Sequence, residues 1–228
     1  MSRFWWQILG LAVSYLFVFA IIASSALVRR WGASESGARK LVHIGVGHWI
    51  LLAPFFFPDW YFAVIGPASF IVLNYLSYRY NLFKGSMELS GKRTPGTVYY
   101  SIALTILVLF FWTVPAEELR PIAMLGMLTL AWGDGLASVI GERSRIGEFR
   151  IFGNRKTVAG SLAMWFFSFL VLMLLPPLFL GVRFASSIVY ALIFSFVATV
   201  VEFFTPGGLD NLTVPLVVSF GYYLWLWS

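Results

Sequence analysis

The sequence predicts an all-α protein, a polytopic membrane helix bundle of about eight transmembrane helices. Of its 228 residues 60% are hydrophobic and only 11% are charged, whereas soluble domains carry about 25% charged residues. The mean hydropathy is correspondingly high, at +0.84. The chain also contains 10 Trp and 10 Tyr residues, which favour the membrane interface. Because no internal repeat or low-complexity linker divides the chain, we expect one integral membrane domain over residues 1–228.

Apolar runs of about 17–25 residues have the length that crosses the hydrocarbon core of a bilayer. Such runs predict spans at residues 4–28, 41–57, 60–78, 98–114, 119–140, 158–180, 185–204 and 212–227. The second of these runs is short, so it could be partly re-entrant rather than fully spanning.

The basic residues indicate how these spans are oriented. All but three of the 16 Lys and Arg residues follow the first, third or fifth predicted span, the exceptions being Arg3, Arg120 and Arg183. The positive-inside rule makes those basic loops cytoplasmic and places both termini on the opposite side. Short basic loops also explain the net charge of +6 without a nucleic-acid partner. The absence of Cys excludes disulfides, thiolate metal sites and a Cys nucleophile.

Two acidic residues stand inside apolar spans, where an ionisable group is costly and therefore indicates a functional site. Asp134 lies in the fifth span and Glu202 in the seventh, both toward the predicted cytoplasmic ends. In this apolar setting Glu202 needs a partner. Gly133 and Gly135 flank Asp134 and would let a ligand or a second backbone approach closely. The alternative is that Asp134 pairs with a basic residue to hold helices together, and that the glycines are packing positions.

A short basic loop after the fifth span predicts a phosphate site. It comprises Asn154, Arg155, Lys156 and Thr157, and Gly160 and Ser161 then open the next helix. Backbone N–H groups at a helix start, together with Arg and Lys side chains, bind anions. A carboxylate facing such a loop could hold Mg²⁺, which bridges phosphates. The pattern is not a Walker A motif, and the loop could also serve only to set the topology.

Two further groups of polar residues complete the candidate site. Arg39 and His43 are spaced i, i+4 and share a helix face, with Lys40 beside them. They could bind phosphate or relay a proton, or they could be interface anchors and a packing residue. Asp210 and Asn211 offer oxygen ligands for a metal or a nucleotide, although both residue types are also ordinary helix caps.

Taken together, these segments resemble the polyprenol kinase family, which includes dolichol kinase, phytol kinase and the CTP-dependent diacylglycerol kinase. The matching stretches are RKLVHIGVG (39–47), PGTVYY (95–100), GDGLASVIGER (133–143), NRKTVAGSLAM (154–164) and VEFFTPGGLDNLTVP (201–215). They occur in the family's order and cover most of residues 39–215. Many dolichol-kinase-like members carry an acidic residue where this chain has Ala159. NRKTVAGS is closer to the phytol kinase subgroup and favours an isoprenoid alcohol over diacylglycerol.

The resemblance implies phosphorylation of a long-chain alcohol, often with CTP as the donor, and dependence on Mg²⁺. It implies functional roles for the residues Asp134, Lys156, Glu202, Asp210, Asn211, Arg39, Lys40 and His43. In the resulting hypothesis Asp134, with Asp210, holds Mg²⁺, while Lys156 and Arg155 neutralise charge on the transferred phosphoryl group. Glu202 or Asp134 orients or deprotonates the hydroxyl group. The expected partners are a lipid alcohol, a nucleotide and the bilayer, and the sequence does not indicate an oligomeric state.

Two rival functions remain open at this point. A CTP-dependent cytidylyltransferase acting on a phospholipid acid has a similar acidic and basic arrangement, but it ends in an H-G-G-x-x-D-R-like segment. Here the corresponding stretch reads GGLDN, without a preceding His or a following Arg. The second rival is an ion-coupled transporter with Asp134 and Glu202 as ligands. Transporters often show inverted repeats, and none is visible in this sequence.

Overall fold

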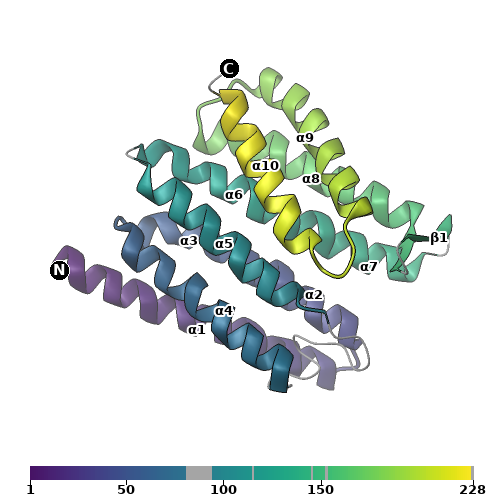
Figure 1. Cartoon of the computed structure of the whole chain (residues 1–228), viewed down its shortest axis with the longest axis horizontal. Helices are drawn as coiled ribbons and strands as arrows, with labels where there is room; N and C mark the ends of the chain where they lie inside the picture. Colours follow the sequence, from purple (N-terminus) through teal and green to yellow (C-terminus); the bar gives the residue numbers. More distant parts are fainter. Residues whose placement is uncertain (81–93, 115, 145, 152–153, 227–228) are drawn as a thin grey trace.

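The computed structural model describes residues 1–80, 94–114, 116–144, 146–151 and 154–226. Over these ranges the protein is a bundle of helices with one two-stranded hairpin (Figure 1). Six of the helical segments are long and apolar enough to cross a membrane. The predicted fold class is therefore confirmed. Lys84, Lys92, Arg93 and Arg145, which belong to the predicted cytoplasmic loops, lie outside the described residues, as does residue 227 at the end of the last predicted span.

The N-terminal half contains the helices α1 (Arg3–Arg30), α2 (Glu35–Gly47), α3 (Trp49–Phe56), α4 (Trp60–Tyr80) and α5 (Gly96–Thr113). The short second predicted span corresponds to α2 and α3, which are separated at His48. The indole N–H of Trp6, near the start of α1, donates to the carbonyl of Phe55 at the end of α3, at 2.9 Å. Thus α2 and α3 together run back along α1. Neither is among the six spanning candidates, and a partly re-entrant course for this run stays a prediction.

The C-terminal half begins with a continuous helical segment that matches the fifth predicted span. It comprises η1 (Glu117–Leu119), α6 (Arg120–Leu128), a π-helical segment η2 (Thr129–Asp134) and α7 (Gly135–Arg143). The remaining elements are β1 (Glu148–Ile151), β2 (Asn154–Thr157), α8 (Val158–Phe179), α9 (Phe184–Phe204) and α10 (Asp210–Leu226).

The centre of the bundle is α6, whose side chains Ile122, Ala123 and Met127 are completely buried. The outer helices instead expose large apolar side chains, such as Leu16 on α1 and Phe196 on α9. A bundle with a buried central helix and apolar side chains on its outer surface is suited to lipid rather than water. The protein is an integral membrane protein.

A polar cluster ties the start of α1 to the turn between α3 and α4. Asp59 accepts hydrogen bonds from Gln7 Nε2 at 2.7 Å and from the Arg3 guanidinium at 2.5 Å. Burial favours a higher pKa for Asp59, but the hydrogen bonds from Gln7 and Arg3 outweigh burial and hold its pKa below the usual value. An ionised Asp59 therefore fastens this end of the bundle, opposite the end that carries the hairpin (Figure 1).

The basic segment that the sequence suggested to be a loop forms an antiparallel hairpin instead. Its strands pair Glu148 with Thr157 and Phe149 with Lys156. The ring of Phe149 packs against Phe203 of α9, with the ring centroids 5.3 Å apart, which anchors the hairpin to the bundle. As a result β2 leads directly into α8, where Thr157 caps the helix by accepting from the backbone N–H of Gly160 at 3.0 Å.

Candidate functional site

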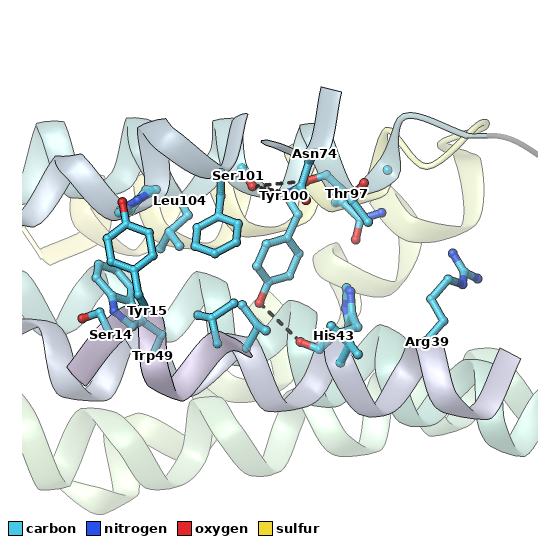
Figure 2. A pocket seen from close by; sticks show the side chains of 18 of the residues that line it. Ser14, Tyr15, Arg39, His43, Trp49, Asn74, Thr97, Tyr100, Ser101 and Leu104 are labelled. Atoms are coloured by element: carbon cyan, nitrogen blue, oxygen red, sulfur yellow. Dashed lines mark hydrogen bonds between the residues drawn. The ribbon is translucent and has the colours of Figure 1, made fainter. Parts of the chain in front are cut away.

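Two adjoining cavities lie toward the end of the bundle that carries the hairpin. The larger one, here called the polar cavity, has a volume of about 410 Å³ and is bordered by α2, α7, β2, α8, α9 and α10. The smaller one, here called the apolar cleft, has a volume of about 90 Å³ and lies among α1, α2, α4 and α5 (Figure 2). Arg39, Lys40 and Asn211 line both spaces.

Asp134 is placed at the polar cavity by the π-helical segment η2. π-Helical turns inside α-helices are rare and occur frequently at functional sites. Asp134 is only 5% exposed, and its Oδ2 accepts from Lys40 Nζ at 2.7 Å. His43 Nε2 lies 3.3 Å from the same oxygen. Asp134 therefore has the basic partner that the structural interpretation required, and this partner belongs to the segment that was expected to bind phosphate.

The glycines on either side of Asp134 permit close helix packing. A Cβ atom at Gly133 would lie 2.5 Å from Ser168 Oγ of α8, and one at Gly135 would overlap Ile44 of α2. Neither glycine lines the polar cavity among the residues that the structure describes. Their packing thus accounts for both glycines, and their contact with a nucleotide stays a prediction.

Glu202 of α9 is also buried, at 6% exposure, and faces the polar cavity. The ammonium group of Lys156 forms an ion pair with the Glu202 carboxylate and donates to the Glu202 backbone carbonyl at 3.2 Å. The expectation that Glu202 has a partner is confirmed. Because Lys156 stands at the end of the hairpin, this pair also holds the start of α8 against the end of α9.

The start of α10 brings a third carboxylate to the same place. Asp210 Oδ1 accepts from the backbone N–H of Asn211 at 3.2 Å, and Asn211 Nδ2 donates to the carbonyl of Gly208 at 3.0 Å. The preceding turn needs Gly207 and Gly208 because their φ angles are +68° and +83°. A side chain at Gly208 would also meet Gly96 Cα at 2.9 Å, so the turn packs directly on the start of α5.

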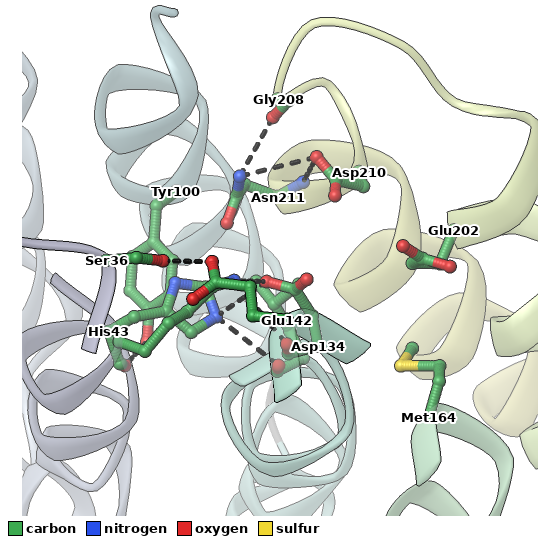
Figure 3. A network of polar contacts seen from close by, with 12 residues as sticks. Ser36, His43, Tyr100, Asp134, Glu142, Met164, Glu202, Gly208, Asp210 and Asn211 are labelled. Carbon is green, nitrogen blue, oxygen red and sulfur yellow. Dashed lines mark hydrogen bonds and ion pairs between the residues drawn. The ribbon is translucent and has the colours of Figure 1, made fainter. Parts of the chain in front are cut away.

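Asp134, Glu202 and Asp210 come from three helices and face one common space (Figure 3). One carboxylate oxygen from each residue lies within 4.8 Å of the other two. Lys40 and Lys156 compensate two of these charges, and Asp210 forms no ion pair with a Lys or Arg of the described chain. Three oxygen donors with one uncompensated charge fit a hard divalent cation. The sequence had suggested only Asp134 and Asp210 as metal ligands, and the structure adds Glu202 to this group.

Two arginines bring further positive charge to the polar cavity. Arg39 is partly buried, and its Nε has no hydrogen-bond partner within the described ranges. Arg155 lines the cavity from β2 and also pairs across the hairpin with Glu148 at 3.0 Å. With Lys40 and Lys156, they surround the carboxylates with four cationic side chains, which suits a polyphosphate ligand.

The remaining predicted residues lie at the start of α8 or in the strand before it. Thr157 and Ser161 line the polar cavity, and so does Gly160. A Cβ atom at Gly160 would be 3.2 Å from the carbonyl of Ala137, so this glycine also permits contact between α7 and α8. The structure describes Asn154 through its backbone, which pairs with Ile151 in the hairpin.

Sequence reasoning missed a stripe of α7 that continues the site. Ser138, Gly141 and Glu142 line the polar cavity at positions i+4, i+7 and i+8 from Asp134. This helical spacing from an intramembrane acid was the signal that could have found them. Glu142 also accepts a hydrogen bond from Ser36 of α2, so the rim of the cavity joins two helices.

Comparison with known proteins agrees with the geometry of the site. The chain is 36% identical over 231 residues to the phytol kinase of Synechocystis sp., covering 97% of this chain and 94% of that protein. It is 30% identical to phytol kinase 1 of Arabidopsis thaliana, covering 89% of this chain and 72% of that protein. The chain belongs to the polyprenol kinase family. Dolichol kinase of Saccharomyces cerevisiae is 30% identical to this chain over 158 residues. The match covers 66% of this chain and 30% of the yeast protein.

No protein-family model and no solved structure matches this member of the polyprenol kinase family. The resemblance inferred from the sequence motifs is confirmed by the phytol kinase and dolichol kinase matches. The individual site residues remain predictions that the arrangement in the structure supports.

The two basic residues of β2, Arg155 and Lys156, test how much each of their ion pairs contributes to the stability of the protein. Replacing Lys156 by Met leaves the buried Glu202 unpaired, and we expect a loss of about 3–5 kcal/mol in the free energy of unfolding. Replacing Arg155 by Met removes only a half-exposed pair, and we expect a loss of about 0–1 kcal/mol. Thermal unfolding in detergent measures both variants. Equal losses for the two would contradict the assignment of Lys156 as the partner of Glu202.

Proposed function

We propose that the protein is a membrane-embedded lipid-alcohol kinase that transfers the terminal phosphoryl group of a nucleotide to an isoprenoid alcohol. CTP is the favoured donor, and phytol or geranylgeraniol are representative acceptors. One observation carries the proposal: three carboxylates and four cationic side chains surround a polar cavity that adjoins an apolar cleft. A charged nucleotide and an apolar alcohol need two such environments, side by side, to react.

The polar cavity has the groups that phosphoryl transfer requires. Asp134, Glu202 and Asp210 would hold Mg²⁺, which neutralises charge on the donor phosphates when it is bound. Arg39 and Arg155 present guanidinium groups, whose planar fork binds phosphate oxygens. Because phosphoryl transfer depends mainly on positioning and charge, these side chains need only fix the donor in line with the acceptor.

The acceptor hydroxyl would meet His43, which lines the apolar cleft and contacts Asp134 of the polar cavity. His43 lines the cleft, and its Nε2 lies 3.3 Å from both the Leu130 carbonyl oxygen and Asp134 Oδ2. A carbonyl oxygen only accepts hydrogen bonds, so Nε2 carries the proton and Nδ1 is left as an acceptor. We infer that His43 can take the hydroxyl proton, with Asp134 stabilising the resulting imidazolium. Glu202 and Asp134 themselves remain alternative bases.

The site is proposed to face the cytoplasm. Arg29 and Arg30 end α1, and Arg143 ends α7, at the same end of the bundle as the hairpin. Arg3 and Arg183 stand at the opposite end. This asymmetry supports a cytoplasmic position by the positive-inside rule, and soluble nucleotides would then reach the polar cavity directly.

The reaction itself is tested with purified protein in proteoliposomes, Mg²⁺, a panel of isoprenoid alcohols and CTP or ATP labelled at the γ-phosphate. We expect lipid-extractable label and release of the nucleoside diphosphate. Release of pyrophosphate, with the nucleotide attached to the lipid, would indicate a cytidylyltransferase instead. Ion flux without any phosphorylated lipid would favour a transporter.

The role of Asp134 is tested by the Asp134→Asn variant, which keeps an oxygen for Lys40 but removes the negative charge. We expect turnover to fall by about 10²–10³-fold or more, while the thermal unfolding curve stays cooperative. The control is Glu118→Gln, which removes an exposed carboxylate from the opposite end of the same continuous helical segment. Wild-type turnover in Asp134→Asn would refute the assignment.

The three carboxylates can be tested as metal ligands without any turnover. We expect Asp210→Asn to weaken binding of Mn²⁺, used as a paramagnetic substitute for Mg²⁺, by about tenfold or more. The matched control is Glu142→Gln, because Glu142 is an acid on the rim of the same cavity but outside the group of three. Titration followed by electron paramagnetic resonance measures both. Equal Mn²⁺ affinity in wild type and Asp210→Asn would exclude Asp210 as a ligand.

A further inference from the structure

The apolar cleft is a separate space from the polar cavity. It lies between α1 and α2 on one side and α4 and α5 on the other. Figure 2 shows its side chains distributed from Ser14, Tyr15 and Trp49 at one end to Arg39 at the other. Along α5 it reaches from Gly96 to Leu104, which is about 12 Å at the rise of an α-helix. The cleft therefore extends from the polar cavity toward the middle of the bundle.

The walls of the cleft suit a hydrocarbon chain. Most of the lining is apolar, and its larger contributors include Val18, Val42, Val46, Trp49, Phe70 and Leu104. Phosphate groups and sugars would find few hydrogen-bond partners along such walls. At the other end the cleft shares Arg39, Lys40 and Asn211 with the polar cavity. An occupant with an apolar body and one polar end would therefore place that end beside the three carboxylates.

Asn74 of α4 gives an independent indication that the occupant carries a hydrogen-bond donor. The residue is 5% exposed and lines the cleft. Its Nδ2 donates to Ser101 Oγ at 2.8 Å and to the Thr97 carbonyl at 3.1 Å. Its Oδ1, however, has no hydrogen-bond partner in the part of the chain that the structure describes. A buried acceptor without a partner is unfavourable, and an alcohol hydroxyl would supply the missing donor as it enters.

One side of the cleft is closed by contacts between α1 and α4. The rings of Tyr15 on α1 and Phe70 on α4 stack with their centroids 5.9 Å apart, and the Tyr15 hydroxyl lies 2.7 Å from Ser69 Oγ. These contacts place the cleft directly behind the line where α1 meets α4. The cavity of about 90 Å³ accommodates the part of a chain next to its hydroxyl. A longer chain would have to part α1 and α4 at this line to reach the lipid.

We propose that the apolar cleft binds the hydroxyl-proximal isoprene units of the lipid alcohol and delivers the hydroxyl to His43 at the edge of the polar cavity. This inference rests on the proposed kinase function and adds the location of the acceptor site. It also explains how a nucleotide in the polar cavity and a lipid substrate could meet inside one bundle without exposing the polar cavity to the bilayer.

Gly66 on α4 allows the cleft to be filled without disturbing the fold. It lines the cleft, and the nearest atom to an added Cβ is Trp49 Cζ2, at 3.9 Å. Gly66→Ala and Gly66→Leu therefore add increasing side-chain volume to the deep end of the cleft. Val72→Phe is the matched control, because Val72 lies on the outer face of the same helix and is 58% exposed. Thermal unfolding in detergent confirms that each variant is folded.

The binding experiment uses a C20 isoprenoid alcohol bearing a diazirine near its hydroxyl, irradiated in proteoliposomes with each variant. Peptide mass spectrometry then locates the label. We expect saturable labelling of cleft residues on α2, α4 and α5, competed by the unlabelled alcohol. Labelling should fall at least tenfold in Gly66→Leu, fall less in Gly66→Ala and stay at the wild-type level in Val72→Phe. Label confined to outward-facing residues, or unchanged in a folded Gly66→Leu variant, would overturn the proposal.

Kinetics separate the cleft from the kinase proposal. In Gly66→Leu we expect the KM for a C20 alcohol to rise at least tenfold, while the KM for the nucleotide stays within twofold of wild type. Labelling of the cleft without any phosphorylated product would contradict the kinase function but support the lipid-binding site. Phosphorylation of the alcohol with all label outside the cleft would do the reverse. If Gly66→Leu fails to fold, the label positions in wild type and Gly66→Ala decide.

Discussion

The compensation of buried negative charge is the constraint on which the rest of this structure depends. Asp134 and Glu202 are nearly inaccessible inside an apolar bundle, and neither could stay ionised there without a cation in contact. Lys40 provides that cation for Asp134, and Lys156 provides it for Glu202. Each pair joins elements that are distant in the sequence. The first fixes α2 against η2 and α7, and the second fixes the hairpin and α8 against α9.

Close backbone packing makes these pairs geometrically possible. Gly135 lets Ile44 of α2 approach the helix that carries Asp134, and Gly133 does the same for α8. The π-helical turn between Thr129 and Asp134 changes the helical phase just before the acid. Small residues and an irregular turn therefore set the direction of the Asp134 side chain, while Lys40 compensates its charge. The third carboxylate, Asp210, is brought to the same space by a glycine turn with positive φ angles.

The sequence predicted the features that follow from the free-energy cost of placing polar or charged groups in lipid. Long apolar runs predicted six helical segments that are long and apolar enough to span a membrane, because backbone polar groups must be satisfied within a helix in lipid. Asp134 and Glu202 were found because a charge in such a run is expensive. Arg39, Lys40 and His43 were found as a group by helical spacing, but the spacing linked Arg39 to His43. The structure instead brings Lys40 and His43 together on Asp134.

Features that depend on tertiary packing could not be predicted from the sequence alone. The π-helical turn has no local signal in Thr129–Asp134, since it depends on how neighbouring helices contact both sides of that segment. The hairpin is held by the contact between Phe149 and Phe203 of α9. A two-stranded hairpin without such a contact is only marginally stable. The apolar cleft is a space between four helices, and Asn74 lines it from a span that carried no sequence motif.

The position of α2 has a consequence for how ligands in the two cavities would influence each other. Arg39 and Lys40 stand on the dividing wall, so the same short stretch of helix contacts whatever fills either space. A ligand that draws Lys40 toward itself would weaken the ion pair between Lys40 and Asp134. A hydrocarbon chain that displaces α2 would move the Arg39 guanidinium relative to the polar cavity. Binding free energies on the two sides of such a wall are thermodynamically linked, and the linkage is reciprocal. In the proposed kinase reaction, the donor and the acceptor would therefore each set part of the affinity of the other.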